Sequence, residues 1–456
     1  MVVYPASEDK TMIRRKVEKH LEDFFGSGKH GALLVDGARQ VGKTFIVEAF
    51  GRSHYDSVVK LDFVKSARAR DIFENVENEE DILTRLTAFS KKPMVPGRTL
   101  VFFDEVQKCP EAVTYVKYLV QDGRFDYVLS GSLLGVEMKN VRSIPVGFMD
   151  EIKMHPLDFE EFVEANGERP ELLEAARTAW RDRRPLAKVF HDRLMKLFRL
   201  YLVVGGMPEA VQTYLDTKDV RRVVSVQKKI LLEYRRDISQ YDEKNALRIR
   251  AVFDRIAPEL NDRNKRFYSN AVGEGGRYDR LEDAFLWLSE AGVAIPSYCV
   301  EEAKVPLLLA RKPRFFKLFM NDVGLLAAMY MNDIQLQILN GETDINFGAV
   351  FENFVAQELA AHGFEPSYYN SAKHGEIDFV LERNGRVLPI EVKCGKHYAR
   401  HRALDHLVAD GTVRVDDPIV FDADAFRTKG AVSYLPIYMA MFLRPPELPD
   451  KMIYEI

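Results

Sequence analysis

The chain has little cysteine: Cys109, Cys299 and Cys394 are the only three among 456 residues. They are odd in number and far apart in the sequence, so neither a disulfide framework nor a cysteine-based zinc site is expected. Long apolar runs are also missing, because the most apolar late segment, residues 434–443, is about half the length of a membrane span. The first ten residues carry charges where a signal peptide needs an apolar stretch. These absences predict a cytoplasmic protein with no targeting segment and no membrane partner.

The chain also lacks an excess of charge of either sign. It has 65 Lys and Arg against 69 Asp and Glu, for a formal net charge of −4. This balance excludes a uniformly basic nucleic-acid coat and a polyacidic tail, so any contact with nucleic acid must be local. Low-complexity tracts and repeats of solenoid period are absent as well. The length predicts roughly three domains rather than one core.

Short β-rich runs alternate with helical stretches over residues 12–150. The runs are GALLVDG (31–37), SVVKLDF (57–63), TLVFFDE (99–105) and DYVLSGS (126–132). Continuous apolar runs separated by helices are typical of strands that are buried on both faces of a parallel sheet. The fold class predicted for residues 1–155 is therefore α/β, with a parallel sheet covered by helices.

The pattern changes twice after residue 155. Residues 156–250 are helical and rich in arginine, with the loop GGMPEA between two helices, and are expected to form a helical lid or connector. Residues 251–332 mix helices with the short strand candidates VAIPSYCV and FFKLF, which favours a small winged-helix-like domain. Residues 333–456 predict a separate α/β domain with an antiparallel hairpin.

The octamer GARQVGKT fits the phosphate-binding pattern G-x-x-x-x-G-K-[ST] and lies between the strand ALLVD and the helix FIVEAF. Backbone N–H groups of such a loop surround the β-phosphate of a nucleotide, which is why side chains are minimal at Gly37 and Gly42. Lys43 is expected to reach the β- and γ-phosphates, and Thr44 to hold Mg²⁺. The predicted ATP-binding residues of this loop are Gly37, Ala38, Arg39, Gln40, Val41, Gly42, Lys43 and Thr44.

Two carboxylates follow the apolar run TLVFF. In a parallel sheet they emerge at the carboxyl end of a buried strand, beside the phosphate-binding loop. Asp104 is expected to bind Mg²⁺ through water and Glu105 to polarise the attacking water. This adjacent pair favours hydrolysis over transfer to a small acceptor, which disfavours a kinase. Ser130, with Ser132 in reserve, is the candidate to bond the γ-phosphate or the water, although an ordinary turn explains the segment equally well.

The segment GEIDFVLERNGRVLPIEVK predicts a β-hairpin whose turn determines which residues face each other. Asn384-Gly385 is the dipeptide preferred in a two-residue hairpin with a type I′ turn. The resulting register places Asp378 opposite Glu391 and Glu376 opposite Lys393, all on one face of the hairpin. Pro389 would disturb this register if it created a bulge.

Like charges that face each other destabilise a strand pair by about 0.2 to 1 kcal/mol, whereas a divalent cation between them reverses the sign. Glu391 and Lys393 then form E-x-K, with an ammonium able to position or deprotonate water beside a phosphodiester. Glu352, in the preceding helix, is a further acid. The predicted metal residues are therefore Glu352, Asp378 and Glu391, with Lys393 as a catalytic residue. The alternative is a solvated amphipathic hairpin with cross-strand salt pairs.

The chain resembles a known group of proteins, the prokaryotic AAA-family P-loop ATPases. Their C-terminal half is a conserved domain of unknown function with a restriction-endonuclease-like end. The resemblance rests on GARQVGKT, LVFFDEVQKCPE, LSGSLLG, SIPVGFMDEIKMHPLDFEEF, GGMPEAV, FFKLFMNDVGLLAA, FENFVAQEL and GEIDFVLE with PIEVK. It implies an AAA-type ATP site on residues 37–44 with Asp104, Glu105 and Ser130. It also implies a helical lid, a winged-helix-like unit and a PD-(D/E)xK nuclease core.

For that nuclease core, the resemblance carries metal roles onto Asp378 and Glu391, the lysine role onto Lys393 and a helix acid onto Glu352. The predicted function is ATP binding and hydrolysis that controls a DNA-directed, nuclease-like C-terminal domain. The alternative is an ATP-dependent switch whose C-terminal domain docks a partner without catalysis. ATP and Mg²⁺ are the expected cofactors, DNA and further copies of the chain are candidate partners, and Arg142 is a candidate arginine finger.

Overall fold

The computed structural model describes residues 13–26, 31–132, 147–241, 243–262, 265, 267, 278–330, 334–341, 348–394 and 401–446. Arg142 lies outside the described residues. The chain divides into two compact units. The first contains Met1–His155 and Val163–Gly167, and the second contains Pro156–Phe162 and Glu168–Ile456. The short helix α7 (Phe159–Ala165) crosses from one to the other.

The first unit is built on a five-stranded sheet in which all paired neighbours are parallel. Its strands, in the spatial order β2-β3-β4-β1-β5, are β1 (Ala32–Asp36), β2 (Ser57–Asp62), β3 (Thr99–Asp104), β4 (Asp126–Gly131) and β5 (Met149–Lys153). The four strands predicted from apolar runs are confirmed. The fifth was missed because its sequence, MDEIK, is mostly charged and half-buried or exposed at the edge of the sheet.

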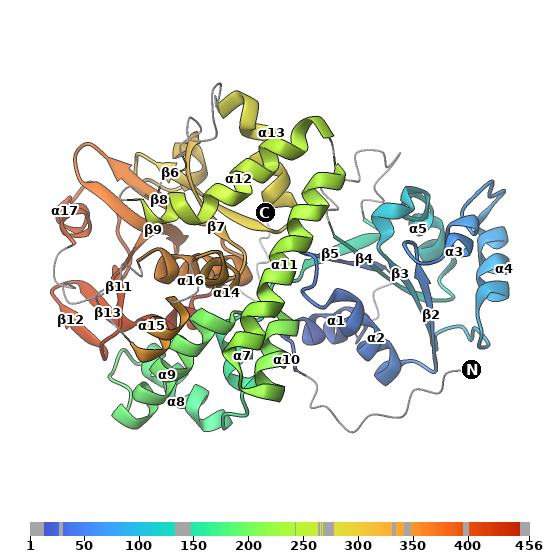
Figure 1. Cartoon of the computed structure of the whole chain (residues 1–456), viewed down its shortest axis with the longest axis horizontal. Helices are drawn as coiled ribbons and strands as arrows, with labels where there is room; N and C mark the ends of the chain where they lie inside the picture. Colours follow the sequence, from blue (N-terminus) through green and yellow to red (C-terminus); the bar gives the residue numbers. More distant parts are fainter. Residues whose placement is uncertain are drawn as a thin grey trace, which may run out of the picture. The chain divides into compact units, whose positions relative to one another are not determined.

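Helices cover both faces of this sheet (Figure 1). They are α1 (Lys16–Gly26), α2 (Lys43–His54), α3 (Ala67–Asp71), α4 (Glu79–Phe89) and α5 (Pro110–Asp122), with the 3-10 turn η1 (Val106–Lys108). The core on one face joins apolar side chains of β1 to β4 with those of α4 and α5. On the other face α2 lies so close to the strands that a Cβ at Gly51 would be 2.7 Å from Val58 Cγ2. The first unit is thus a three-layered AAA-type P-loop fold.

The second unit begins with a helical region. Its helices are α8 (Pro170–Arg181), α9 (Lys188–Val204), α10 (Pro208–Thr217), α11 (Val220–Tyr241), α12 (Glu243–Asn261) and α13 (Tyr278–Glu290). The loop Gly205-Gly206 separates α9 from α10 as expected, and Gly206 N donates to the buried Asp322 carboxylate at 2.5 Å. Within the described part of the chain, every helix is too short or too polar to cross a membrane.

A mixed sheet forms the rest of the second unit, in the order β12-β13-β11-β10-β9-β8-β6-β7. Its strands are β6 (Ala294–Val300), β7 (Arg311–Met320), β8 (Ser367–Ser371), β9 (Gly375–Arg383), β10 (Arg386–Val392), β11 (Ile419–Asp422), β12 (Arg427–Lys429) and β13 (Val432–Pro436). The accompanying helical elements are η4 (Leu307–Ala310), α14 (Val323–Met329), α15 (Ile334–Asn340), α16 (Gly348–Ala361), α17 (Arg402–Ala409) and η5 (Ile437–Phe442). The fold class is thus α/β throughout, with a helical region that lies between the two sheets along the sequence.

This sheet crosses the boundary that was expected between residues 332 and 333. The hairpin of β6 and β7, expected as the wing of a separate domain, pairs with β8 through β6, for example at Tyr298 and Ser367. The sequence pattern marks β6 and β7 as strands but carries no information about which sheet they join. The order of strands makes β7 the edge of the C-terminal sheet.

The β9–β10 hairpin has the predicted turn and register. Asn384 and Gly385 both have positive φ angles, 54° and 69°. The strands pair from Arg383 opposite Arg386 to Phe379 opposite Ile390, and the register stays intact at Pro389. The ladder ends there, because the Asp378 carboxylate accepts the next backbone hydrogen bond, from Val392 N at 2.8 Å.

Candidate functional site

The phosphate-binding loop connects β1 to α2 and needs glycine at both ends. Gly37 has φ 151°, and a Cβ there would lie 2.2 Å from the Met154 carbonyl oxygen. Gly42 has φ 98° and ψ 16° immediately before α2 begins. Both conformations are accessible to glycine at little cost and strained for other residues. The loop therefore turns tightly around the N-terminus of α2, where free N–H groups favour an anion.

Lys43 folds back onto this loop. Its Nζ donates to the carbonyl oxygens of Gly37 and Ala38 at 2.7 and 2.8 Å, and the side chain is buried. Burial lowers the pKa of Lys43 to about 8, although Glu105 and the other nearby carboxylates favour the charged form. An ammonium held by neutral carbonyls in a buried position is poorly compensated, and a phosphate group would supply the missing charge.

Asp104, at the end of β3, is the centre of the site. The buried carboxylate accepts hydrogen bonds from Thr44 Oγ1 at 2.9 Å and from Ser130 Oγ at 2.6 Å. It also pairs with Lys60 Nζ at 2.9 Å. The ends of β2, β3 and β4 and the start of α2 thus meet at the carboxyl edge of the parallel sheet, which is where ligands bind in such folds.

Lys60 was not among the predicted site residues. Its ammonium pairs with Glu48 as well as with Asp104, at 2.8 Å to Glu48 Oε1. A signal was present in the sequence, because a lysine near the end of the apolar strand SVVKLDF must find an acid if the sheet covers it. The hydroxyl of Thr44 and the carboxylate of Asp104, the predicted magnesium donors, lie in direct contact and suit Mg²⁺, with Lys60 as the competing cation.

Glu105 directly follows Asp104 and has a left-handed backbone, φ 58° and ψ 48°. Such a conformation costs a non-glycine residue about 1 to 3 kcal/mol and is concentrated at functional sites. The Glu105 carboxylate accepts a hydrogen bond from Gln107 Nε2 at 2.6 Å and from Ser132 Oγ at 3.3 Å. Ser130 therefore contacts the first acid and Ser132, the reserve candidate, contacts the second. Gln107 was not predicted.

The four residues predicted for a nuclease site lie in the second unit, where four acids gather. This acidic cluster consists of Glu352 from α16, Glu376 and Asp378 from β9, and Glu391 from β10. Lys393 forms an ion pair with Glu391. Glu376, expected opposite Lys393, instead contacts Lys317 and Asn370.

Two lysines that the sequence analysis missed complete the acidic cluster. Lys317, from the edge strand β7, is fully buried and lies 3.0 Å from Glu376, 3.6 Å from Glu352 and 3.8 Å from Asp378. Lys265 forms an ion pair with Glu352. Neither lysine was recognised, because each is remote in sequence from the hairpin and only the fold brings it there.

Burial and charge act differently on the members of the acidic cluster. Burial raises the pKa of Glu391 to about 8, helped by the charge of Asp378 and opposed by Lys393. Burial also raises the pKa of Glu352. Burial would likewise raise the pKa of Asp378, but the neighbouring lysines, Lys317 first, outweigh it and hold this pKa below its usual value. The lysines therefore favour an ionised Asp378, whereas burial disfavours the charged form of Glu391.

A different group has the spacing of metal ligands. Among the described residues, ligand atoms of Asp158, Glu358 and His362 lie within 4.8 Å of one another. However, Arg444 Nη1 approaches His362 Nδ1 at 2.6 Å, and arginine can only donate. His362 must then carry its proton on Nε2, 3.3 Å from the Asp158 carboxylate, and this tautomer cannot ligate a metal through Nε2.

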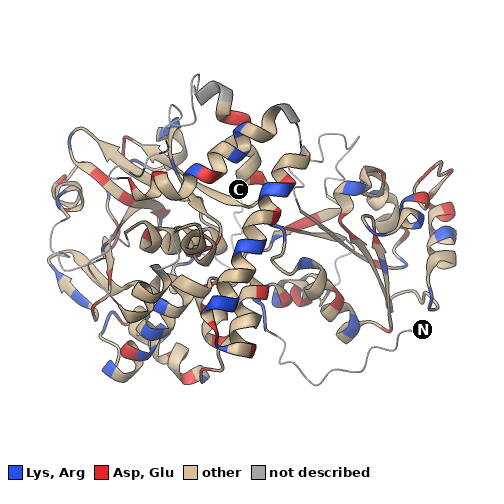
Figure 2. Ribbon diagram, in the orientation of Figure 1, with Lys and Arg blue, Asp and Glu red and all other residues tan. Residues whose placement is uncertain are grey.

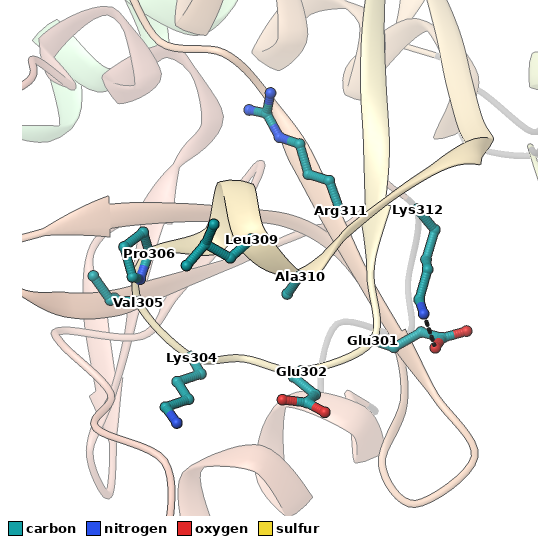
Figure 3. A pocket seen from close by; sticks show the side chains of 9 residues that line it. All are labelled: Glu301, Glu302, Lys304, Val305, Pro306, Leu309, Ala310, Arg311 and Lys312. Atoms are coloured by element: carbon teal, nitrogen blue, oxygen red, sulfur yellow. Dashed lines mark ion pairs between the residues drawn. The ribbon is translucent and has the colours of Figure 1, made fainter.

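The connection between β6 and β7 borders a cavity of about 340 Å³ (Figure 3). On its rim Lys312 Nζ pairs with Glu301 at 3.2 Å, while Val305, Pro306 and Leu309 supply aliphatic surface. A cavity of about 600 Å³ shares Glu301 and neighbouring residues with it. None of the residues predicted for ATP or metal binding lines either cavity.

Three family profiles match segments of the chain. Residues 29–163 match an AAA domain, residues 195–336 a domain of unknown function (DUF8612) and residues 347–435 another domain of unknown function (DUF4143). The first match agrees with the AAA-type fold and supports ATP binding. The two C-terminal matches name no activity. No match is found among curated proteins.

Solved structures with similarity to the chain include the Walker-type ATPase PABY2304 of Pyrococcus abyssi, with 14% identity and a TM-score of 0.43 over 72% of this chain and 99% of that one. Another is the Aeropyrum pernix Orc1 protein in complex with DNA, with 13% identity and a TM-score of 0.28 over 69% of this chain and 90% of that one. A third is Cdc6p from Pyrobaculum aerophilum, with 11% identity and a TM-score of 0.25 over 74% of this chain and 99% of that one.

Proposed function

We propose that the AAA-type domain of this chain binds ATP with Mg²⁺ and hydrolyses it, and that the nucleotide state controls a DNA-directed second unit. The observation that carries the first part is the hydrogen-bonded contact of Thr44 and Ser130 with Asp104 beside the phosphate-binding loop. A buried carboxylate, a hydroxyl from the helix N-terminus and a buried lysine are the groups that phosphoryl transfer requires.

Each residue has a distinct role in this proposal. Lys43 exchanges its bonds to two loop carbonyls for bonds to the β- and γ-phosphates. Thr44 and Asp104 hold Mg²⁺, which when bound neutralises charge on the phosphates. Glu105 accepts a proton from the attacking water, and Gln107 and Ser132 orient its carboxylate. Ser130 fixes Asp104 in the position that the metal needs.

Two substitutions test these roles. Lys43→Ala is expected to abolish ATP binding, whereas Glu105→Gln is expected to keep binding and lose hydrolysis by about a hundredfold or more. Binding is measured with a fluorescent ATP analogue and hydrolysis by phosphate release. Glu79→Gln, at an exposed position of α4, is the matched control. Hydrolysis by Glu105→Gln at the parental rate would show that Glu105 is not the base.

A surface of the second unit supports the DNA partner. On α11 three pairs of cations recur every seven residues: Arg221-Arg222, Lys228-Lys229 and Arg235-Arg236. Seven residues are nearly two helical turns, so the pairs lie along one side of the helix at intervals of about 10 Å. Figure 2 shows Lys and Arg recurring along α11. We call these six residues the basic stripe, and all except Arg235 are exposed.

Neighbouring acids form ion pairs with members of the basic stripe. Asp219 pairs with Arg221 at 3.2 Å, Glu209 with Lys229 at 3.6 Å and Asp254 with Arg235 at 2.8 Å. Regularly spaced, mostly exposed cations suit the phosphates of a nucleic-acid backbone.

The gathering of Asp378, Glu391 and Lys393 near Glu352 favours DNA cleavage by the second unit. The placement of Lys317 among the same acids favours the alternative, a non-catalytic domain that docks a partner under control of ATP. Plasmid nicking in Mg²⁺ or Mn²⁺ that is lost in Lys393→Ala would support cleavage. DNA binding without nicking, unchanged in Lys393→Ala, would support docking.

A further inference from the structure

The acidic cluster already contains a cation supplied by the protein. Lys317 is completely buried, and its ammonium lies within 4 Å of carboxylate oxygens from Glu352, Glu376 and Asp378. These three oxygens come from a helix and a strand that are separate in sequence from β7. A group that is surrounded in this way has the position that a bridging metal ion has in a carboxylate site.

A divalent ion and this ammonium cannot use the same oxygens together. Mg²⁺ holds its oxygen ligands at about 2.1 Å and demands a nearly octahedral arrangement. An ion that is bound to the Glu376 oxygen would sit within a few ångströms of the Lys317 nitrogen, which lies 3.0 Å from that oxygen. Two cations at such a distance repel each other, and the Lys317 side chain is completely buried. The donor set with Lys317 in place therefore does not fit a divalent ion.

The other ion pairs of the acidic cluster also leave no place for a divalent ion. Lys265 pairs with Glu352 and Lys393 pairs with Glu391, so each carboxylate of the acidic cluster has an ammonium partner within 4 Å. The carboxyl oxygens of the acidic cluster also fall outside the metal-like grouping found among the described residues, which consists of Asp158, Glu358 and His362. Three lysines against four acids leave little charge for a metal to neutralise.

We propose that Lys317 is the resident cation of the acidic cluster and that the native chain binds no divalent ion there. This inference deepens the proposed function, because it assigns the second unit to the docking alternative rather than to metal-dependent cleavage. Lys317 then positions Glu376 and Asp378 as part of the folded sheet, and the acidic cluster ties the edge hairpin of β6 and β7 to α16 and β9.

The test is a titration of the nucleotide-free full chain with Mn²⁺, followed by electron paramagnetic resonance. All variants carry Asp104→Asn, which removes the metal-binding acid of the AAA-type domain. We expect no stoichiometric Mn²⁺ in this parent protein. Lys317→Met removes the ammonium and keeps an apolar stem, so we expect it to bind one Mn²⁺ at least about tenfold more tightly than the parent. Adding Asp378→Asn should remove that ion.

Lys312→Met is the matched control, because Lys312 lies on the same strand but pairs with Glu301 at the surface. It should bind Mn²⁺ no better than the parent. The proposal is overturned if the parent binds one Mn²⁺ that Asp378→Asn removes, or if folded Lys317→Met gains no Mn²⁺. If Lys317→Met does not fold, the comparison of Mn²⁺ binding by the parent with and without Asp378→Asn tests the proposal. Failure to hydrolyse ATP would refute the proposed function without affecting this result.

Discussion

The affinity for ATP should fall as the pH rises above about 8, and Lys43 is the cause. In the nucleotide-free protein, burial lowers the pKa of Lys43 to about 8. Bound phosphates favour the charged ammonium and return this pKa to its ordinary range. Below pH 8 the lysine is charged in both states and the affinity does not change for this reason. Above pH 8 binding must take up a proton, so the dissociation constant rises with pH.

The size of the effect follows from the pKa. With a value of about 8 for the free protein, the dissociation constant should rise by about 20- to 30-fold between about pH 7.5 and pH 9.5, or about 2 kcal/mol. Isothermal titration calorimetry in two buffers of different ionisation enthalpy measures the proton uptake directly, which should approach one proton per nucleotide at the higher pH.

A matched control separates Lys43 from general effects of pH. Lys65→Met removes an exposed lysine of the same unit and should leave the pH dependence unchanged. A dissociation constant that is flat over this range, or binding without proton uptake, would show that Lys43 does not contact the phosphates as a group of depressed pKa.

Three further predictions concern other parts of the chain. Gly37→Ala should destabilise the first unit by about 2 to 4 kcal/mol in urea unfolding and weaken ATP binding, because its Cβ meets the Met154 carbonyl. Gly97 also has a positive φ, but a Cβ there would have nothing within 4 Å, so Gly97→Ala should lower the free energy of unfolding by less. Equal losses of stability in the two variants would show that the contact with the Met154 carbonyl is not the cause. Lys60→Met should lower the free energy of unfolding by about 1 to 2 kcal/mol, since Asp104 loses a partner. Mg²⁺ with ATP should restore this stability. A loss of thermal stability that Mg²⁺ and ATP do not restore would contradict the idea that Lys60 and Mg²⁺ compete for Asp104. Replacing Lys228 and Lys229 with glutamine should weaken DNA binding and reduce the slope of log K against log salt by about 1.8, whereas Lys188→Gln on α9 should not.

The first unit was predictable because its information is local. GARQVGKT contains its own glycines, and the apolar run before Asp104 identifies both a buried strand and the end at which the acid emerges. The hairpin turn was predictable for the same reason, since Asn384-Gly385 determines the register of its own strands. The contact of Thr44 with Asp104 follows from these local facts and from the topology of a parallel sheet.

The charges that oppose the acids were not predictable in this way. Lys317 is 61 residues from Asp378 and lies in a run, FFKLF, that identifies a strand but not its neighbours. Only the pairing of β6 with β8 brings that strand into the C-terminal sheet. Lys60 was overlooked because a lysine within a strand pattern has many explanations. The hairpin register brings Asp378 near Glu391, but it carries no information about the cation beside them.

The pairing of β6 with β8 has a practical consequence for dissecting the molecule. A fragment that starts at residue 333 would lack β6 and would leave the edge of β8 open from Ser367 to Tyr369, and such open edges recruit other chains and aggregate. It would also lack the lysine that compensates the buried Glu352 and the partly exposed Glu376 and Asp378. A soluble C-terminal piece therefore has to begin upstream of Ala294, and insolubility of a shorter one would reflect a missing hairpin rather than a missing partner.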